Sequence, residues 1–177
     1  MQKKTTLKIT YCGLFAGVIA VCSFVSLPSV VPFTLQTMGV FLTFFILGTK
    51  YGTISTLTYL LLGAMGLPVF SGFKGGIGVL FSQTGGFLWG FLVAGVILVI
   101  LEKILKKPIQ NKIITGVIIL LITYFSGTAW YVFAYGKGAD FISVLKICVI
   151  PFVIPDFIKL FVAFKLSKRV KSVDLNK

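Results

Sequence analysis

The stretch ICVIPFVIPDFIKLFVAF, residues 147–164, is almost uniformly apolar and contains only two charged residues, Asp156 and Lys159. It is about as long as the α-helix that crosses the hydrocarbon core of a bilayer. Residues three apart lie on one face of a helix, so the carboxylate and the ammonium group can pair and still offer an acceptor and a donor to a third group. An ionisable residue within a span usually marks a pathway or a site, and a buried ion pair adds little stability. The sequence therefore predicts a binding site here, with a purely structural ion pair as the alternative.

The whole chain is strongly apolar, with 57% hydrophobic and 12% charged residues among 177. A water-soluble domain of this size cannot bury so much apolar side chain. We therefore expect an all-α integral membrane protein, a single membrane domain over residues 1–177 with six transmembrane helices. The expected spans are residues 9–27, 33–48, 51–66, 85–101, 113–133 and 144–164, and five or seven spans are the alternatives.

The net charge of +13 does not indicate nucleic-acid binding, because the cations lie between the expected spans and not on a polar surface with interleaved aromatic residues. Most of the cations fall on one side of the expected membrane: Lys3, Lys4, Lys8, Lys50, Lys103, Lys106, Lys107, Lys112, Lys165, Lys168, Arg169, Lys171 and Lys177. Lys74, Lys137 and Lys146 fall on the other side. The positive-inside rule then predicts that both termini lie in the cytoplasm.

The residues that enzymes commonly use are scarce. The chain has no His and only four acidic residues, its cysteines lack metal-ligand spacing, and it has no G-x-x-x-x-G-K-[ST] motif. We therefore expect no metal, no cofactor and no enzymatic activity. If the protein transports actively, the energy comes from a partner or from an ion gradient.

A glycine-rich segment, GAMGLPVFSGFKGGIGVLFSQTGG, occupies residues 63–86. It is too interrupted for a long helix and too apolar for a solvated loop. Irregular backbone near membrane depth is tolerated where it packs on protein or lines a cavity, so we expect an outer loop between the third and fourth helices that folds over a site, with a structural connector as the alternative. Lys74 within it, and the helix that begins after Thr84, Gly85 and Gly86, favour an anion.

Other candidate residues lie near the same expected side of the membrane. Gln36 is costly to place in a span without a partner. Tyr124 and Trp130 belong to an aromatic series in the fifth span, which is either an interfacial belt or a stacking wall for a ring. In the first span, Ala16 and Ala20 belong to a series of small residues that lets another helix approach closely, whether that helix is internal or a partner's.

These segments, in this order, resemble the BioY family, the biotin-specific S components of energy-coupling factor (ECF) transporters. The matching segments are VPFTLQ at 31–36, GLPVFSG at 66–72, GGIGVLF at 75–81, TGG at 84–86, Gly127 with Trp130, and Pro151-Phe152 with Asp156 and Lys159. Ser82-Gln83 departs from the Gly-Pro that the family usually has before TGG.

The resemblance implies a six-helix protein in the cell membrane of a prokaryote. It would capture biotin from outside and deliver it inward with a coupling transmembrane protein and two ATPases. It also implies that Asp156 and Lys159 contact the ureido ring, and that the face of Ala16 and Ala20 meets the coupling protein. A ureido group has two N–H donors and one carbonyl acceptor, which an ionised Asp and Lys on one helix face can match.

For the rest of the ligand, we expect Phe73, Trp89, Tyr124 or Trp130 to wall the bicyclic ring. We expect the region of Lys74 and Thr84-Gly85-Gly86 to bind the valerate carboxylate. Two other functions remain open on the sequence: a proton-coupled secondary transporter of a small anionic metabolite, with Asp156 as the proton carrier, and a structural membrane subunit.

Overall fold

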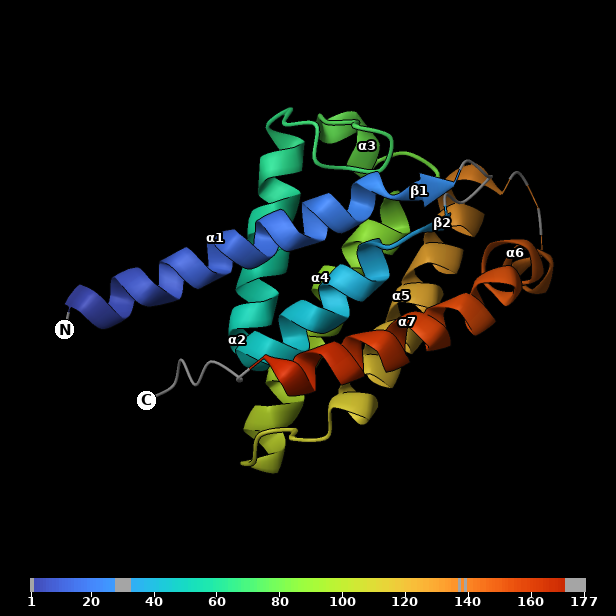
Figure 1. The fold of residues 1–177 in the computed structure, drawn as a ribbon. Helices are drawn as coiled ribbons and strands as arrows, with labels where there is room; N and C mark the ends of the chain where they lie inside the picture. Colours follow the sequence, from blue (N-terminus) through green and yellow to red (C-terminus); the bar gives the residue numbers. More distant parts are fainter. Residues whose placement is uncertain (1, 28–32, 137, 139, 171–177) are drawn as a thin grey trace.

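The computed structural model describes residues 2–27, 33–136, 138 and 140–170. The motif residues Val31 and Pro32, and the cations Lys137, Lys171 and Lys177, lie outside the described residues, as do the side chains of Lys3 and Lys4. The helices are α1 (Gln2–Phe24), α2 (Gln36–Ala64), α3 (Ile77–Leu80), α4 (Gly85–Leu105), α5 (Lys112–Tyr135), α6 (Phe141–Cys148) and α7 (Ile150–Arg169) (Figure 1). Two short strands, β1 (Ser26–Leu27) and β2 (Phe33–Thr34), pair antiparallel between α1 and α2.

Within the described ranges, α1, α2, α4 and α5 are each long and apolar enough to cross a membrane. Helices α6 and α7, which are bent by 47° relative to each other, meet the same test as a pair. Length and composition thus give four or five spans where the sequence predicted six. The expected spans 33–48 and 51–66 form one element, α2, and the expected span 144–164 is divided between α6 and α7 at Val149, two residues before Pro151.

A kink at Gly48 divides α2 into two arms. Gly48 has φ 78° and ψ 177°, a conformation that is open essentially to glycine alone. In Figure 1 the ribbon of α2 changes direction sharply at this end, so that its first arm lies beside α7 and its second arm rises beside α4. At the bend, the Thr49 hydroxyl donates a hydrogen bond to the carboxylate of Glu102 on α4, and the same carboxylate accepts from the backbone N–H of Ile109 at 2.8 Å.

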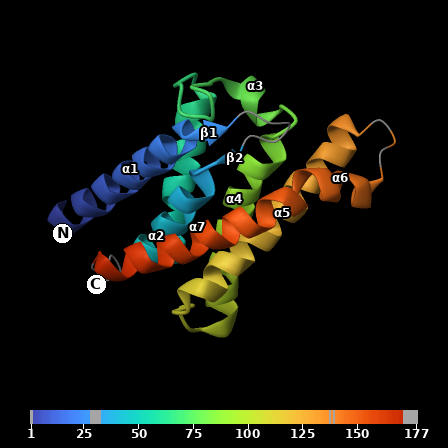
Figure 2. The same cartoon turned by 45° about the vertical axis from the view of Figure 1, so that its right-hand side comes forward.

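The core forms where α1 packs on α2 and where α4 packs on α5 and α2. Fully buried side chains from these helices meet there, among them Ile19, Phe41, Tyr59, Leu98 and Ile119. Small residues allow the close approach: an added Cβ at Gly90 on α4 would lie only 2.8 Å from the Cα of Thr123 on α5. Helix α6 packs beside α5 and α7, at the right of the view in Figure 2.

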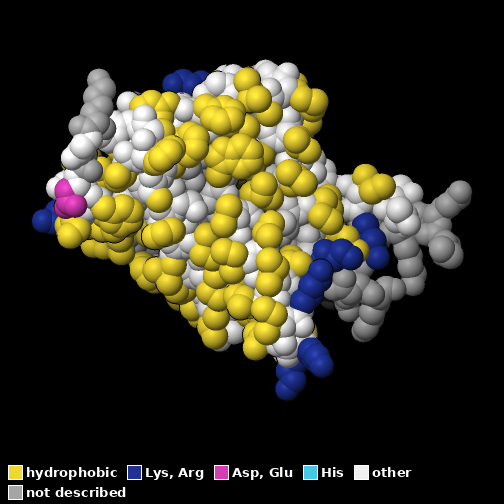
Figure 3. Space-filling model, turned by 180° about the vertical axis from the view of Figure 1, so that it is seen from behind, with side chains coloured by type: hydrophobic (Ala, Val, Ile, Leu, Met, Phe, Trp, Pro, Cys, Tyr) yellow, Lys and Arg dark blue, Asp and Glu magenta, His cyan; other side chains and the backbone are white. Residues whose placement is uncertain are grey.

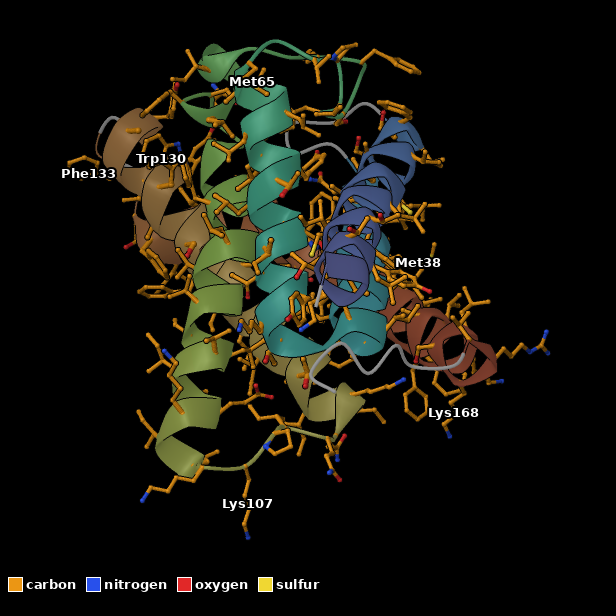
Figure 4. The ribbon with its side chains drawn as sticks, turned by 90° about the vertical axis from the view of Figure 1, so that its left-hand side faces the viewer. Met38, Met65, Lys107, Trp130, Phe133 and Lys168 are labelled. Carbon is orange, nitrogen blue, oxygen red and sulfur yellow. The ribbon has the colours of Figure 1, made fainter. Side chains whose placement is uncertain are left out.

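The outer surface is largely apolar, as expected of a protein whose solvent is lipid. Figure 3 shows hydrophobic side chains covering most of one face, with most of the visible Lys and Arg at the lower right and others at the top and left edges. In Figure 4, Lys107 and Lys168 lie at the lower end of the bundle, while Met65 lies at the opposite end. The end of the bundle with Lys107 and Lys168 therefore carries more positive charge than the Met65 end.

The glycine-rich segment folds over the Met65 end of the bundle. Gly76 N–H donates to the carbonyl of Gly63 at 2.7 Å, and Phe70 N–H donates to the carbonyl of Lys74 at 2.9 Å. Phe70 is 1% exposed, and its ring meets that of Tyr59 edge-on, with centroids 5.5 Å apart. The segment is thus held to α2 by the hydrogen bond to Gly63 and by one buried aromatic ring.

Candidate functional site

A cavity of about 350 Å³ lies below the glycine-rich segment, between the first turn of α2, α4, α5 and the first half of α7. Its walls combine a broad apolar surface with a few polar groups. The lining residues are Thr34, Gln36, Thr37, Phe70, Ser71, Lys74, Gly78, Val79, Ser82, Thr84, Phe87, Leu88, Phe91, Leu120, Thr123, Tyr124, Cys148, Phe152, Asp156 and Lys159.

The two charged residues of α7 form an ion pair on the cavity wall. Lys159 Nζ lies 2.8 Å from Asp156 Oδ1, and each side chain is 6% exposed. The other carboxylate oxygen, Oδ2, accepts a hydrogen bond of 2.6 Å from the Tyr124 hydroxyl on α5. Among the residues that the structure describes, each oxygen of Asp156 therefore has one donor, and lone pairs of the carboxylate and N–H groups of the ammonium remain for a ligand.

Aromatic rings cover the ion pair from the side of β2. The Lys159 ammonium lies 4.0 Å from the ring centroid of Phe33, a cation–π distance. Phe33 in turn stacks on Phe152 of α7, with centroids 6.2 Å apart. These rings shield the charges from water, which strengthens any polar contact made beside them.

Gln36 begins α2 on the cavity wall and is 6% exposed. Its Nε2 donates to the Tyr59 hydroxyl at 3.0 Å, so the polar side chain has the partner that its position requires. Tyr59 is 1% exposed and donates to the carbonyl of Val69 in the glycine-rich segment at 3.2 Å.

A buried hydroxyl on the same wall has no partner among the described residues. Most buried Ser and Thr side chains on α2 bond to the carbonyl four residues earlier, as Thr43 does to Gly39 at 2.8 Å and Thr56 to Gly52 at 2.9 Å. In contrast, Thr123 Oγ1 on α5 is buried and unpaired, as is Thr128 Oγ1 further along the same helix. Only Thr123 of these two is among the lining residues.

The predicted anion region contributes two of its residues to the cavity. Lys74 and Thr84 both line it, and the hydroxyls of Thr84 and Ser82 lie 3.3 Å apart. Gly85 lies outside the lining: its N–H donates to the carbonyl of Ser82 at 2.9 Å, and an added Cβ would collide with the carbonyl of Leu80. Gly85 therefore closes a tight turn against the backbone.

Three of the predicted aromatic walls also lie outside the cavity. Phe73 is 65% exposed and stacks on Phe24 of α1, with centroids 4.4 Å apart. Trp89 and Trp130 donate their indole N–H groups to the carbonyls of Leu80 and Ser82, at 3.2 and 3.0 Å. The two indoles lie at a shallow outer groove between α4 and α5, where Figure 4 labels Trp130 near Phe133. They fasten the backbone that precedes α4.

Ala16 and Ala20, predicted to meet a partner, are buried in the core at 1% and 7% exposure. The open side of α1 instead carries Gly13 and Gly17, where an added Cβ would meet nothing within 4 Å. The small residues thus fall on two faces, and the burial of the alanines argues against a partner contact through their methyl groups.

Most of the apolar wall could not be singled out from the sequence. Phe70, Phe87, Leu88, Phe91 and Leu120 line the cavity, together with Phe152. Phe70 and Phe152 lie within the segments that carried the family resemblance, which was the available signal for them. The residues from α4 and α5 could not be told from lipid-facing neighbours in uniformly apolar spans.

The chain is similar throughout its length to known proteins. The model of the BioY family matches residues 1–174. A protein named biotin transporter BioY from Thermotoga maritima is 41% identical over 170 residues, covering 93% of this chain and 96% of the relative. Biotin transporter BioY2 from Lactococcus lactis subsp. cremoris is 40% identical over 163 residues, covering 90% and 87%. A 2.1 Å crystal structure of the S-component for biotin from an ECF-type ABC transporter superposes with a TM-score of 0.82 at 27% identity, covering 96% of this chain and 93% of the other.

Proposed function

The chain belongs to the BioY family, and from this premise we propose that it is the biotin-capturing S component of an ECF-type transporter. It binds biotin with high affinity and delivers it inward together with a coupling transmembrane protein and two ATPases. The observation that carries this proposal is the buried ion pair of Asp156 and Lys159 on the wall of an otherwise apolar cavity.

The chemistry of the ion pair matches the ureido ring of biotin. Asp156 accepts a hydrogen bond from a ureido N–H, and Lys159 donates one to the ureido carbonyl. Charge-assisted hydrogen bonds of this kind contribute roughly 1.5–3 kcal/mol each. The cavity volume of about 350 Å³ lies within the usual range for small-molecule sites, and its Phe and Leu side chains suit a bicyclic ring with an aliphatic tail.

The valerate carboxylate of biotin points toward the glycine-rich segment, where Lys74 and Thr84 supply a cation and a hydroxyl. The segment then acts as a lid on the outer side of a six-span domain, whose second and third spans are the two arms of α2 on either side of Gly48. Both termini lie in the cytoplasm, since the cation-rich ends of the helices are on their side. The coupling protein meets the open face of α1 that carries Gly13 and Gly17, where small residues permit close helix packing.

Equilibrium binding of labelled biotin to the purified chain in detergent tests this proposal. The parent chain should bind biotin saturably, and Asp156→Asn should weaken binding by at least about tenfold because a charged acceptor is lost. Lys165→Met serves as the matched control, since it removes a cation of the same helix outside the cavity. A folded parent chain that does not bind biotin would refute the proposal. Proton-driven uptake in liposomes without ATPases would favour the secondary transporter instead.

A further inference from the structure

The hydrogen bonds around Tyr59 fix the orientation of the Gln36 side-chain amide. The Tyr59 hydroxyl lies 3.2 Å from the carbonyl oxygen of Val69, which can only accept, so the single hydroxyl proton of Tyr59 is donated there. The same hydroxyl must then accept from Gln36, 3.0 Å away. Only the amide nitrogen of Gln36 can be that donor, which leaves its oxygen free to face another group.

The carbonyl of Val69 is itself held in place. Ser23 at the end of α1 has its hydroxyl 2.6 Å from the same carbonyl oxygen and 2.7 Å from that of Ala20, so its single proton is shared between these two acceptors. Tyr59 and Ser23 are 1% and 0% exposed, so these contacts are closed to bulk water. If the Gln36 amide were reversed, Tyr59 would have to donate to it, and the buried hydrogen bond from Tyr59 to Val69 would be lost.

Gln36 lines the same cavity as Asp156 and Lys159. Phe33, three residues before Gln36, covers the Lys159 ammonium at 4.0 Å, and Gln36 N–H bonds to the Thr34 hydroxyl at 3.2 Å, so this short segment runs along the cavity wall beside Lys159. The wall thus presents an acceptor at Asp156, a donor at Lys159 and a further acceptor at Gln36. A ureido group presents the complementary groups, two N–H donors and one carbonyl acceptor.

We propose that Gln36 Oε1 accepts a hydrogen bond from the second ureido N–H, and that Tyr59 is the positioning residue that makes Gln36 an acceptor. This inference rests on the proposed biotin site and specifies which atoms of the ligand Gln36 contacts. Gln36 then selects a urea over a ring in which that N–H is replaced by an oxygen atom. Tyr59 acts through Gln36 and does not touch the ligand.

The test compares biotin with its two cyclic carbamate analogues, each of which has one ureido N–H replaced by oxygen, on the full-length chain in detergent. Tyr59→Phe and Gln36→Met should weaken biotin binding by about five- to tenfold, the loss of one buried hydrogen bond. Both substitutions should weaken the binding of one carbamate analogue by the same factor. They should not weaken the other analogue, which already lacks the N–H that Gln36 accepts.

Thr56→Val is the matched control, because it removes a buried hydroxyl of the same helix that bonds to the carbonyl of Gly52 and lies outside the cavity lining. It should not distinguish between the two analogues. If Tyr59→Phe weakens the binding of biotin and of both analogues equally, Tyr59 has only a structural role and the inference is overturned. If Tyr59→Phe does not fold, an equal loss for all three ligands in Gln36→Met overturns the inference in the same way. A parent chain that binds no biotin overturns the proposed function and this inference together, whereas biotin binding without analogue selectivity overturns the inference alone.

Discussion

The Tyr124 hydroxyl donates to Asp156 Oδ2 at 2.6 Å and thereby joins the middle of α5 to α7 across the cavity. This contact leaves the carboxylate with one donor on each oxygen, because Lys159 occupies Oδ1. The direction in which Asp156 points is therefore set by two helices. A ligand that pairs with Asp156 meets an acceptor that is already oriented.

Tyr124→Phe should weaken biotin binding by about tenfold, because a hydrogen bond to a charged group is worth roughly 1.5–3 kcal/mol and its loss lets the carboxylate turn. Tyr131→Phe is the control, as it makes the same change on α5 at a residue outside the cavity lining. Equilibrium titration with labelled biotin measures both. Equal affinity of Tyr124→Phe and the parent would show that Lys159 alone orients Asp156.

Lys159→Met should destabilise the ligand-free protein by about 3–5 kcal/mol, because it leaves the buried carboxylate of Asp156 without its cation. Combining it with Asp156→Asn should restore most of that stability, since both charges are then gone. Thermal unfolding in detergent measures stability, and biotin titration measures function. The double variant should remain unable to bind biotin, which separates the role of the pair in binding from its role in folding.

Thr123→Val and Thr128→Val each replace a buried, unpaired hydroxyl by a methyl group of the same shape. Both should stabilise the ligand-free protein by about 1 kcal/mol, because an unsatisfied buried polar group is costly. Only Thr123 lines the cavity, so only Thr123→Val should also weaken biotin binding. Equal biotin affinity of the two variants would show that the Thr123 hydroxyl does not meet the ligand.

Gly48→Ala should destabilise the protein by about 1–3 kcal/mol, because alanine is strained at a φ of 78° even though the site has room for a Cβ. Gly13→Ala is the matched control: it also has room, but it lies in the regular helix α1, where alanine is favoured. Comparing the melting temperatures of the two variants isolates the effect of the backbone conformation on stability. Similar melting temperatures would mean that the kink tolerates other residues.

Substitutions on α1 should separate folding from assembly. Ala16→Leu should destabilise the isolated chain, because the residue is buried and the core has no space for a larger side chain. Gly17→Leu should leave biotin binding by the isolated chain unchanged and reduce uptake in the complete transporter, because it fills the open face of α1. Uptake assays with the coupling protein and ATPases, paired with binding assays, check this. Full uptake by Gly17→Leu would place the partner elsewhere.

The sequence predicted which helices form the site better than it predicted which side chains of each helix face the cavity. The spacing of Asp156 and Lys159 predicted their pairing, which the 2.8 Å contact confirms, because i,i+3 geometry is a local property of a helix. Trp89 was expected on the wall, whereas its neighbour Leu88 lines the cavity. One residue along a helix turns the side chain by about 100°, and a uniformly apolar span carries no signal of that rotation.

Span counting was limited for a similar reason. The sequence predicted the end of a span at Gly48, and the structure breaks α2 into two helical arms at this residue, which length and composition count as one span. The break at Val149 lies two residues before Pro151, which the sequence contained, but the bend of 47° and the packing of α6 against α5 are not written in that local pattern. Span counts and bend angles thus depend on contacts between helices as well as on the local sequence pattern.

The chain has two tryptophans, and both donate their indole N–H groups to carbonyls of residues 80–82, immediately before α4. All of the tryptophan fluorescence of this protein therefore originates at the junction between the glycine-rich segment and the helix bundle. A rearrangement of that segment would change the emission without any attached dye. The native chain carries its own optical reporter beside the glycine-rich segment.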